Sequence, residues 1–270
     1  MLSMIGIQRT IIFVSVSMII TSCFHPNPPK VIPAITRDTL KYTYQAIKER
    51  ADDCGNKPDS GCSVARISYP VFDGQGSLND SVVNKILCLF DAHPDKDLQT
   101  RAKHFIEEYQ AFKKAKKHSA LPFSLHLYGL VVRQDSSLLT LETGGSTFSG
   151  NAHPIDQTMF TNWNATTQKQ IELGDILVTG YLPKLTKVAD SIFRKNENLK
   201  DTSSLARDYF FKGNKFSLNN NFLITPLGLR FLYNEYEIKP YAAGTTNLFI
   251  PYTSIKTLLK PHTVISQYIK

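Results

Sequence analysis

The spacing of apolar side chains predicts a succession of strands and helices after residue 35. From Thr36 to Ala51, apolar residues recur at every second position, the period of a strand, although the end of this segment also suits a helix. The run "SVARISYPVF" predicts a second strand. "PFSLHLYGLVVRQD" and "SLLTLETGG" predict an antiparallel hairpin with a tight polar turn. "QTMFTNWN" predicts a further strand, and "FLITPLGLRFLYNEYEI" predicts two more that break between Pro226 and Gly228.

Three segments have the spacing of amphipathic helices. In "LNDSVVNKILCLFD" apolar residues lie four apart, and Asn79 or Asp80 can cap the first turn. "DKDLQTRAKHFIEEYQAFKKAKKH" has one apolar face and Asp95 as its expected cap. The apolar face expected for "LPKLTKVADSIFRKN" consists of Leu182, Leu185, Val188 and Ile192. Short helices are expected at residues 173–177 and 254–259. Because the strand connections are short, the predicted class is α+β, with mixed antiparallel sheets and packed amphipathic helices.

The first 35 residues have the features of an export signal and a tether. Arg9 precedes an apolar run of about ten residues, which is too short to cross a bilayer but is typical of a secretory signal. "Ile20-Thr21-Ser22-Cys23" resembles the bacterial lipobox, which implies that Cys23 is diacylated and becomes the first residue of the mature chain. An ordinary signal or an uncleaved anchor are the alternatives. Residues 1–22 are therefore assigned to the signal peptide and residues 23–35, which are rich in proline, to a tether. Phe24, rather than Asp, after the cysteine favours the outer membrane.

Charge and cysteine content agree with export. The formal net charge is +8, and removing residues 1–22 removes Arg9 and no acid, which leaves +7. In the cell envelope such a chain meets anionic polymers, so nucleic acid is not an expected partner. Cys54 and Cys62 flank the turn-forming run "GNKPDSG", and an oxidising compartment predicts a disulfide between them. Cys88 is expected to be a buried thiol on the apolar side of a helix.

The last third of the chain resembles a known family. "YEIKPYAAGTTNLFIPYTSIKTLL" is similar to the closing signature of the DUF3298 family, found in the extracellular region of a lysozyme-sensing anti-sigma factor and beside some peptidoglycan deacetylases. The matching positions are Tyr236, Ile238, Pro240, Tyr241, Gly244, Ile250, Pro251 and Tyr252. "TGGSTFSGNAHP" resembles the family's glycine-rich turn, which ends at His153. "ISYPVFDG" and the helix after it resemble the companion DUF4163 domain. The resemblance divides the body into a DUF4163-like region, residues 36–118, and a DUF3298-like domain, residues 119–270.

Motifs for catalysis are missing from the sequence. It contains no H-E-x-x-H motif, no G-x-S-x-G motif and no P-loop, so we expect no catalytic residues, no metal ligands and no cofactor. The candidate ligand-binding residues are Gly145, Asn151, His153, Trp163 and Tyr241. His153 follows a glycine-rich loop and can either contact a ligand or serve as a hydrogen-bonded structural residue. Trp163 can either stack on a sugar or cover the core.

These observations predict a lipid-anchored, non-enzymatic binding module. The expected partners are the membrane, through the lipid on Cys23, and either a lysozyme-like protein or peptidoglycan. The alternative is an uncharacterised enzyme acting on the cell wall, or an accessory subunit of one. A concave site with convergent titratable groups and shifted pKa values would favour the enzyme.

Overall fold

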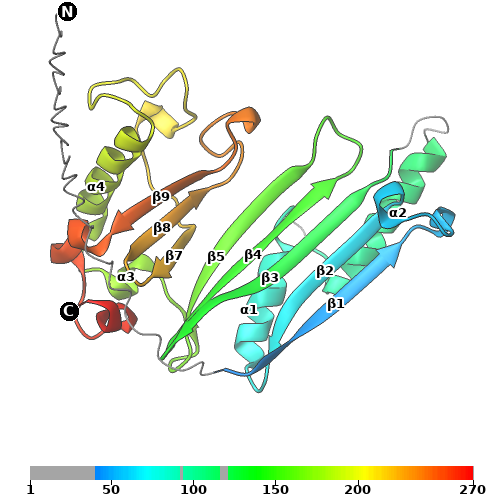
Figure 1. Ribbon diagram of the computed structural model, residues 1–270, viewed down its shortest axis with the longest axis horizontal. Helices are drawn as coiled ribbons and strands as arrows, with labels where there is room; N and C mark the ends of the chain where they lie inside the picture. The colour runs from blue at the N-terminus through cyan, green and yellow to red at the C-terminus, as the bar shows by residue number, and fades with distance from the viewer. Residues whose placement is uncertain (1–39, 92–93, 116–120, 270) are drawn as a thin grey trace, which may run out of the picture. The chain divides into compact units, whose positions relative to one another are not determined.

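The computed structural model describes residues 40–91, 94–115 and 121–269 (Figure 1). The predicted signal peptide, the tether and Cys23 lie outside these ranges, so their assignment stays a prediction. None of the helices in the described ranges is long and apolar enough to cross a membrane. The described residues contain helices and two sheets, which confirms the predicted α+β class.

The first sheet has six strands in the order β1-β2-β3-β4-β5-β6. The strands are β1 (Tyr42–Arg50), β2 (Val64–Phe72), β3 (Ser124–Asp135), β4 (Leu138–Phe148), β5 (Ile155–Asn164) and β6 (Lys169–Gln170). The predicted strand after Thr36 therefore exists, and its helical alternative is excluded. Neighbouring strands are antiparallel except β2 and β3, which are parallel. The expectation of antiparallel pairing throughout is wrong at this pair, because two helices intervene and return the chain to the same end of the sheet.

The predicted hairpin of β3 and β4 is confirmed. Its turn is the two-residue loop of Ser136 and Ser137, and Ser136 has a positive φ of 52°. Turns of this length twist in the same sense as the strands when φ is positive, so the loop sets the register of the pair.

Two helices cover one face of the six-stranded sheet. They are α1 (Gly76–Leu87) and α2 (Leu98–Ala115), which lie behind the sheet in Figure 1. The helices and the sheet share one core, which includes Val82, Ile86, Ala102, Phe105, Ile67, Leu125, Leu127 and Leu141. The opposite face, called the open face below, carries the exposed side chains of Lys48, Arg66 and His126.

The ends of these helices differ from the prediction. Asn79 does not cap α1; its side chain bonds the backbone nitrogen and oxygen of Phe72, at 2.8 and 2.9 Å, and ties the helix to β2. Asp97, not Asp95, accepts a hydrogen bond from the backbone of Thr100 at 2.7 Å in the first turn of α2. Cys88 is exposed, not buried, because it lies one helical turn after the exposed Asn84, on the solvent side of α1.

The second sheet is antiparallel and has the order β7-β8-β9. Its strands are β7 (Phe222–Thr225), β8 (Gly228–Tyr233) and β9 (Thr246–Pro251), and it packs with α3 (Leu173–Ile176) and α4 (Tyr181–Asn196). The inward face of α4 consists of Leu185, Ala189 and Phe193. Leu182, predicted to face inward, is 54% exposed. The prediction is confirmed for Leu185, and Val188 and Ile192 are partly buried against the same core, so it is wrong only at Leu182.

Three asparagine side chains join the free edge of β5 to the second sheet. Asn162 donates to the backbone oxygen of Phe222 at 2.9 Å and accepts from the backbone nitrogen of Ile224 at 2.8 Å. Asn221 and Asn234 bond the backbone of Thr158 in the same strand. In the described residues β6 pairs with Trp163 and Asn164 of β5, and the amides of Asn221 and Asn234 satisfy backbone groups farther along the same edge. This junction places the segment after β8 beside the start of β5.

Candidate functional site

Three aromatic rings from distant parts of the chain meet at this junction. The ring centroids of His153 and Tyr241 lie 3.7 Å apart, with 17° between the planes. Tyr236 completes the group, with its ring centroid 6.0 Å from that of His153 and 5.7 Å from that of Tyr241. We call His153, Tyr236 and Tyr241 the aromatic stack.

Local backbone conformation brings each ring to this place. His153 lies in the connection between β4 and β5, where Gly150 has a φ of 85°. Tyr236 has a φ of 63° and lies two residues after Asn234, whose side chain is hydrogen-bonded to the backbone of Thr158. A positive φ is uncommon for a tyrosine and marks a strained position, which is frequent at functional sites. Tyr241 begins the 3-10 helix Tyr241–Ala243, and Gly244, which follows it, also has a positive φ.

Hydrogen bonds orient the imidazole ring of His153. Its Nδ1 lies 2.8 Å from the backbone oxygen of Pro154, and its Nε2 lies 3.1 Å from the hydroxyl of Tyr236. A carbonyl oxygen only accepts, so Nδ1 carries a proton. In the neutral ring, Nε2 then accepts from the Tyr236 hydroxyl. The two bonds hold the imidazole in one tautomer and in one plane.

Two carboxylates adjoin the aromatic stack. Burial raises the pKa of Glu235, and the nearby charge of Asp156 raises it further. One oxygen of Glu235, Oε2, is buried and has no hydrogen-bond partner among the described residues. Burial also raises the pKa of Tyr241, and the charges of Glu235 and Asp156 add to this effect. The two acids and the stack therefore form one electrostatically connected group.

This arrangement suits a ligand with both apolar faces and polar edges. The flat rings offer surfaces for stacking, and the hydroxyls, imidazole and carboxylates offer hydrogen-bond partners. Over residues 40–91, 94–115 and 121–269, no group of three or more His, Cys, Asp and Glu side chains is placed to hold a metal ion.

The structure brings two of the predicted site residues together, His153 and Tyr241. Asn151 is exposed in the bend before His153. Gly145 does not line the stack; it is buried in β4, where a Cβ atom would lie 2.5 Å from the backbone oxygen of His126. Trp163 is 5% exposed and belongs to the core beneath the helices, so it offers no platform to a ligand.

Three residues of the site were not predicted as ligand-binding. They are Asp156, Glu235 and Tyr236. Tyr236 belongs to the signature that resembles the DUF3298 family, so its position could have suggested it. The two acids gave no local signal, because their role depends on contact between β5 and the segment after β8.

Cys54 and Cys62 form a disulfide, with 5.3 Å between their Cα atoms. The bond closes the loop between β1 and β2, at the opposite edge of the six-stranded sheet from β6.

Comparison with known families divides the chain into two matched segments. Residues 57–156 match the family model described as "Deacetylase PdaC", and residues 174–253 match "Protein of unknown function (DUF3298)". The chain carries a DUF3298 domain. His153 and Asp156 lie in the PdaC match, whereas Glu235, Tyr236 and Tyr241 lie in the DUF3298 domain. The two matched segments therefore build the site together.

Solved structures share this fold. A DUF3298 family protein from Pseudomonas aeruginosa PAO1 superposes with a TM-score of 0.67 at 20% identity, covering 83% of this chain and 96% of the other. A DUF3298 family member from Bacteroides fragilis NCTC 9343 superposes with a TM-score of 0.67 at 21% identity, covering 85% and 97%. No curated protein matches the sequence.

Proposed function

We propose that this protein is a lipid-anchored binding module of the bacterial cell envelope whose aromatic stack binds a saccharide of the cell wall. The observation that carries the proposal is the stack itself, with His153 against Tyr241 at 3.7 Å and Tyr236 beside them. Sugar rings have apolar faces that pack on aromatic rings, and their hydroxyl groups pair with imidazole and carboxylate edges. The match of residues 57–156 to the PdaC family supports a role at the cell envelope.

The anchor and the location are part of the same proposal. The lipobox-like residues that end at Cys23 support lipid attachment, and Phe24 supports the outer membrane. The proline-rich residues 23–35 would act as a spacer between the lipid and the folded body.

A titration of the full-length protein with soluble peptidoglycan fragments tests the proposal. We expect saturable binding, and we expect Tyr241→Ala to weaken it by about tenfold, equivalent to about 1.4 kcal/mol. Tyr241→Phe keeps the ring and should retain most of the affinity. Phe210→Ala is the control, because Phe210 is an aromatic residue outside the stack and is 53% exposed, as Tyr236 is. Equal affinity for all three variants would overturn the role of the stack.

A lysozyme-like protein is the second ligand to titrate. Saturable, salt-resistant binding to lysozyme that is lost in Tyr241→Ala, without binding to peptidoglycan fragments, would replace the saccharide with a protein partner. Salt must be varied in both titrations, because the positive charge of the chain attracts anionic ligands nonspecifically.

An enzyme acting on the cell wall is the competing function. The raised pKa of Glu235, with Asp156 and His153 nearby, favours it, because a raised pKa makes a carboxyl group better suited to general acid–base catalysis near neutral pH. Incubation of the protein with peptidoglycan, followed by chromatography of the soluble products, separates the two functions. Product release that is abolished by Glu235→Gln would establish the enzyme, and unchanged peptidoglycan would support the binding module.

A further inference from the structure

A row of aligned side chains crosses the open face from β1 to β5. Strand pairing places Lys48 beside Arg66, Arg66 beside His126, His126 beside Ser146, and Ser146 beside Asp156. Residues paired in this way point to the same face of a sheet. The row spans four strand spacings, or about 19 Å, and ends at an acid of the proposed saccharide site. It therefore connects that site with the opposite edge of the sheet.

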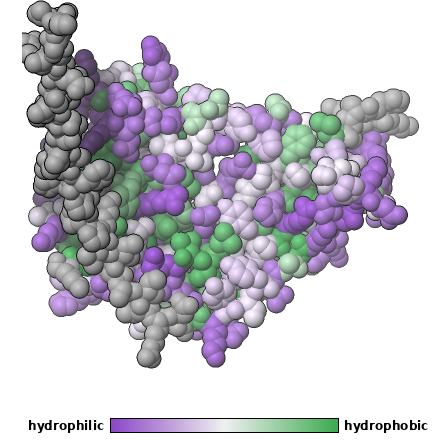
Figure 2. All heavy atoms as spheres, viewed as in Figure 1, coloured by the Kyte–Doolittle hydropathy of each residue, from purple (hydrophilic) through white to green (hydrophobic). Residues whose placement is uncertain are grey.

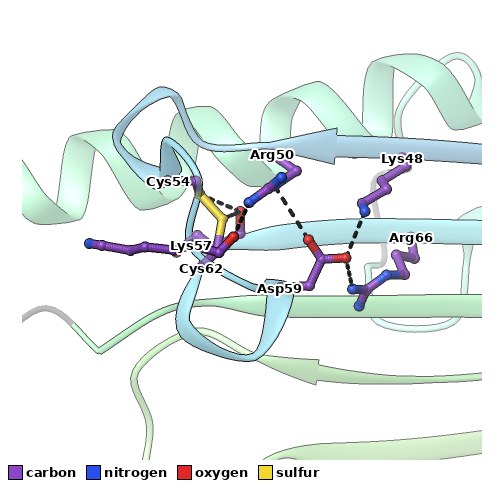
Figure 3. A network of polar contacts seen from close by, with 8 residues as sticks. Lys48, Arg50, Cys54, Lys57, Asp59, Cys62 and Arg66 are labelled. Carbon is purple, nitrogen blue, oxygen red and sulfur yellow. Dashed lines mark hydrogen bonds and ion pairs between the residues drawn. A yellow bond between two sulfur atoms is a disulfide. The ribbon is translucent and has the colours of Figure 1, made fainter.

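The far end of the row is strongly basic. Figure 3 shows Asp59, in the loop closed by the disulfide, surrounded by Lys48, Arg50 and Arg66. Its Oδ2 lies 2.6 Å from Nζ of Lys48 and is bonded to Arg66, and its Oδ1 lies 3.3 Å from Nε of Arg50. The ion pairs of Asp59 thus show that these cations are placed to bind a carboxylate group.

The carboxylate of Asp59 does not balance the charge at this end. Among the described residues these three cations share one acid, which leaves two positive charges. The side chains of Lys48 and Arg66 are still 48% and 45% exposed. Hydrophilic side chains gather at this end of the face, on the right in Figure 2. The cations are held in place by Asp59 and can accept a second anion without reorganisation.

Aromatic side chains lie along the middle of the open face. The rings of His126 and Tyr128 lie 5.8 Å apart, and the hydroxyl of Tyr128 donates to Glu142 at 2.9 Å. Tyr128 lies flat over Gly144, where a Cβ atom would be 2.5 Å from its hydroxyl. A ligand lying along the row would thus meet aromatic rings between its two ends.

We infer that Lys48 and Arg66 form a second subsite, which binds a carboxylate group of the same saccharide chain that the aromatic stack holds. This inference rests on the proposed function. The ligand class is an extended, carboxylate-bearing glycan that lies across β1 to β5. Its carboxylates meet Lys48, Arg66 and His126, and the faces of its sugar rings meet the aromatic stack.

The test uses the full-length protein and two sugar chains of equal length. The first is an oligogalacturonate, which carries one carboxylate on each sugar, and the second is an uncharged chito-oligosaccharide. We expect the doubly substituted variant Lys48→Gln/Arg66→Gln to weaken oligogalacturonate binding at least tenfold and to leave chito-oligosaccharide binding unchanged. Lys184→Gln/Lys187→Gln on α4 removes the same charge at exposed positions and should change neither affinity by more than about twofold.

The variant Asp59→Asn gives a prediction of the opposite sign. It removes the internal carboxylate while keeping the shape of the side chain, so oligogalacturonate should bind at least threefold more tightly. Equal weakening by the two double variants, or no gain in Asp59→Asn, would overturn the subsite. Thermal unfolding of each variant shows whether a lost affinity reflects lost structure.

Two further outcomes separate this inference from its alternatives. If Tyr241→Ala leaves oligogalacturonate binding intact while Lys48→Gln/Arg66→Gln abolishes it, carboxylate binding by Lys48 and Arg66 is supported and saccharide binding by the stack is overturned. If Tyr241→Ala weakens oligogalacturonate binding but Lys48→Gln/Arg66→Gln behaves like its control, saccharide binding by the stack is supported and the subsite is overturned. Binding to phosphatidylglycerol vesicles that is lost in the double variant, without binding to oligogalacturonate, would replace the glycan with a lipid surface and overturn the proposal.

Discussion

The ring of His153 lies against the ring of Tyr241, 3.7 Å away between centroids, although the two residues come from segments that match different protein families. Neither segment contains the whole aromatic stack. The edge of β5 and the asparagines that bind it hold the two segments in contact. The site therefore depends on the junction as much as on the rings, and both can be tested by substitution.

Substitution of Glu235 should stabilise the fold at neutral pH. Its raised pKa means that the folded state holds the proton more tightly than the unfolded state does. This carboxyl group therefore favours folding below its ordinary pKa of 4.5, and the advantage is lost as the pH rises through the folded pKa. Above that pH the charged form opposes folding. Glu235→Gln should raise the melting temperature at pH 7, and the gain should shrink toward pH 4.

Thermal unfolding at several pH values measures this effect. Glu107→Gln is the control, because the side chain of Glu107 is 69% exposed and its charge is well solvated. A melting temperature of Glu235→Gln that is below the wild-type value at pH 7 would show that the charged carboxylate stabilises the site instead.

Asn162 should be costly to remove, because its side chain bonds two buried backbone groups of β7. Asn162→Ala leaves the oxygen of Phe222 and the nitrogen of Ile224 without these partners. The expected loss is about 2–4 kcal/mol of unfolding free energy, measured by urea denaturation. Asn164→Ala, which removes turn hydrogen bonds to Thr166 and Thr167, should cost about 1 kcal/mol or less. Similar losses in the two variants would contradict the bridging role.

Removal of the disulfide should lower stability moderately. The bond joins residues separated by eight positions, and closure of so short a loop contributes about 2–3 kcal/mol. Cys54→Ser/Cys62→Ser should show this loss in urea denaturation under oxidising conditions. Cys88→Ser serves as the control, since this thiol is free and exposed. If a reducing agent destabilises the double variant as much as the wild type, the disulfide is not the source of the effect.

Gly144 should not tolerate a side chain. A Cβ atom there would lie 2.5 Å from the hydroxyl of Tyr128 and 2.9 Å from the backbone oxygen of Gln157. Gly144→Ala should therefore cost about 1–3 kcal/mol. The cost should fall in a Tyr128→Ala background, because the ring is the nearest obstacle. Gly174→Ala should be nearly neutral, since no described atom outside its chain neighbours and its own helix backbone lies within 4 Å of the added Cβ. An unchanged cost in the double variant would identify the backbone as the obstacle.

Local patterns in the sequence were sufficient to predict the strands and helices in which buried residues recur at regular intervals. The alternation of Leu125 and Leu127 with exposed His126 identified β3, and helical spacing identified α1, α2 and α4. These patterns report which face of a single element is buried, so they predict its type without its partners. The predicted face of α4 wrongly included Leu182 and omitted Ala189 and Phe193, because spacing alone does not show where a helix first meets the sheet.

Long-range contacts decided the rest. The parallel pairing of β2 and β3, the strand β9, the burial of Trp163 and the meeting of His153 with Glu235 and Tyr236 depend on residues far apart in sequence. The sequence by itself determined the class of the fold, the helices, the hairpin and a signature that resembles DUF3298. Only the tertiary structure decided which of the candidate ligand-binding residues lie together in a site. Contacts between residues of two different sheets produce no periodic pattern in the sequence.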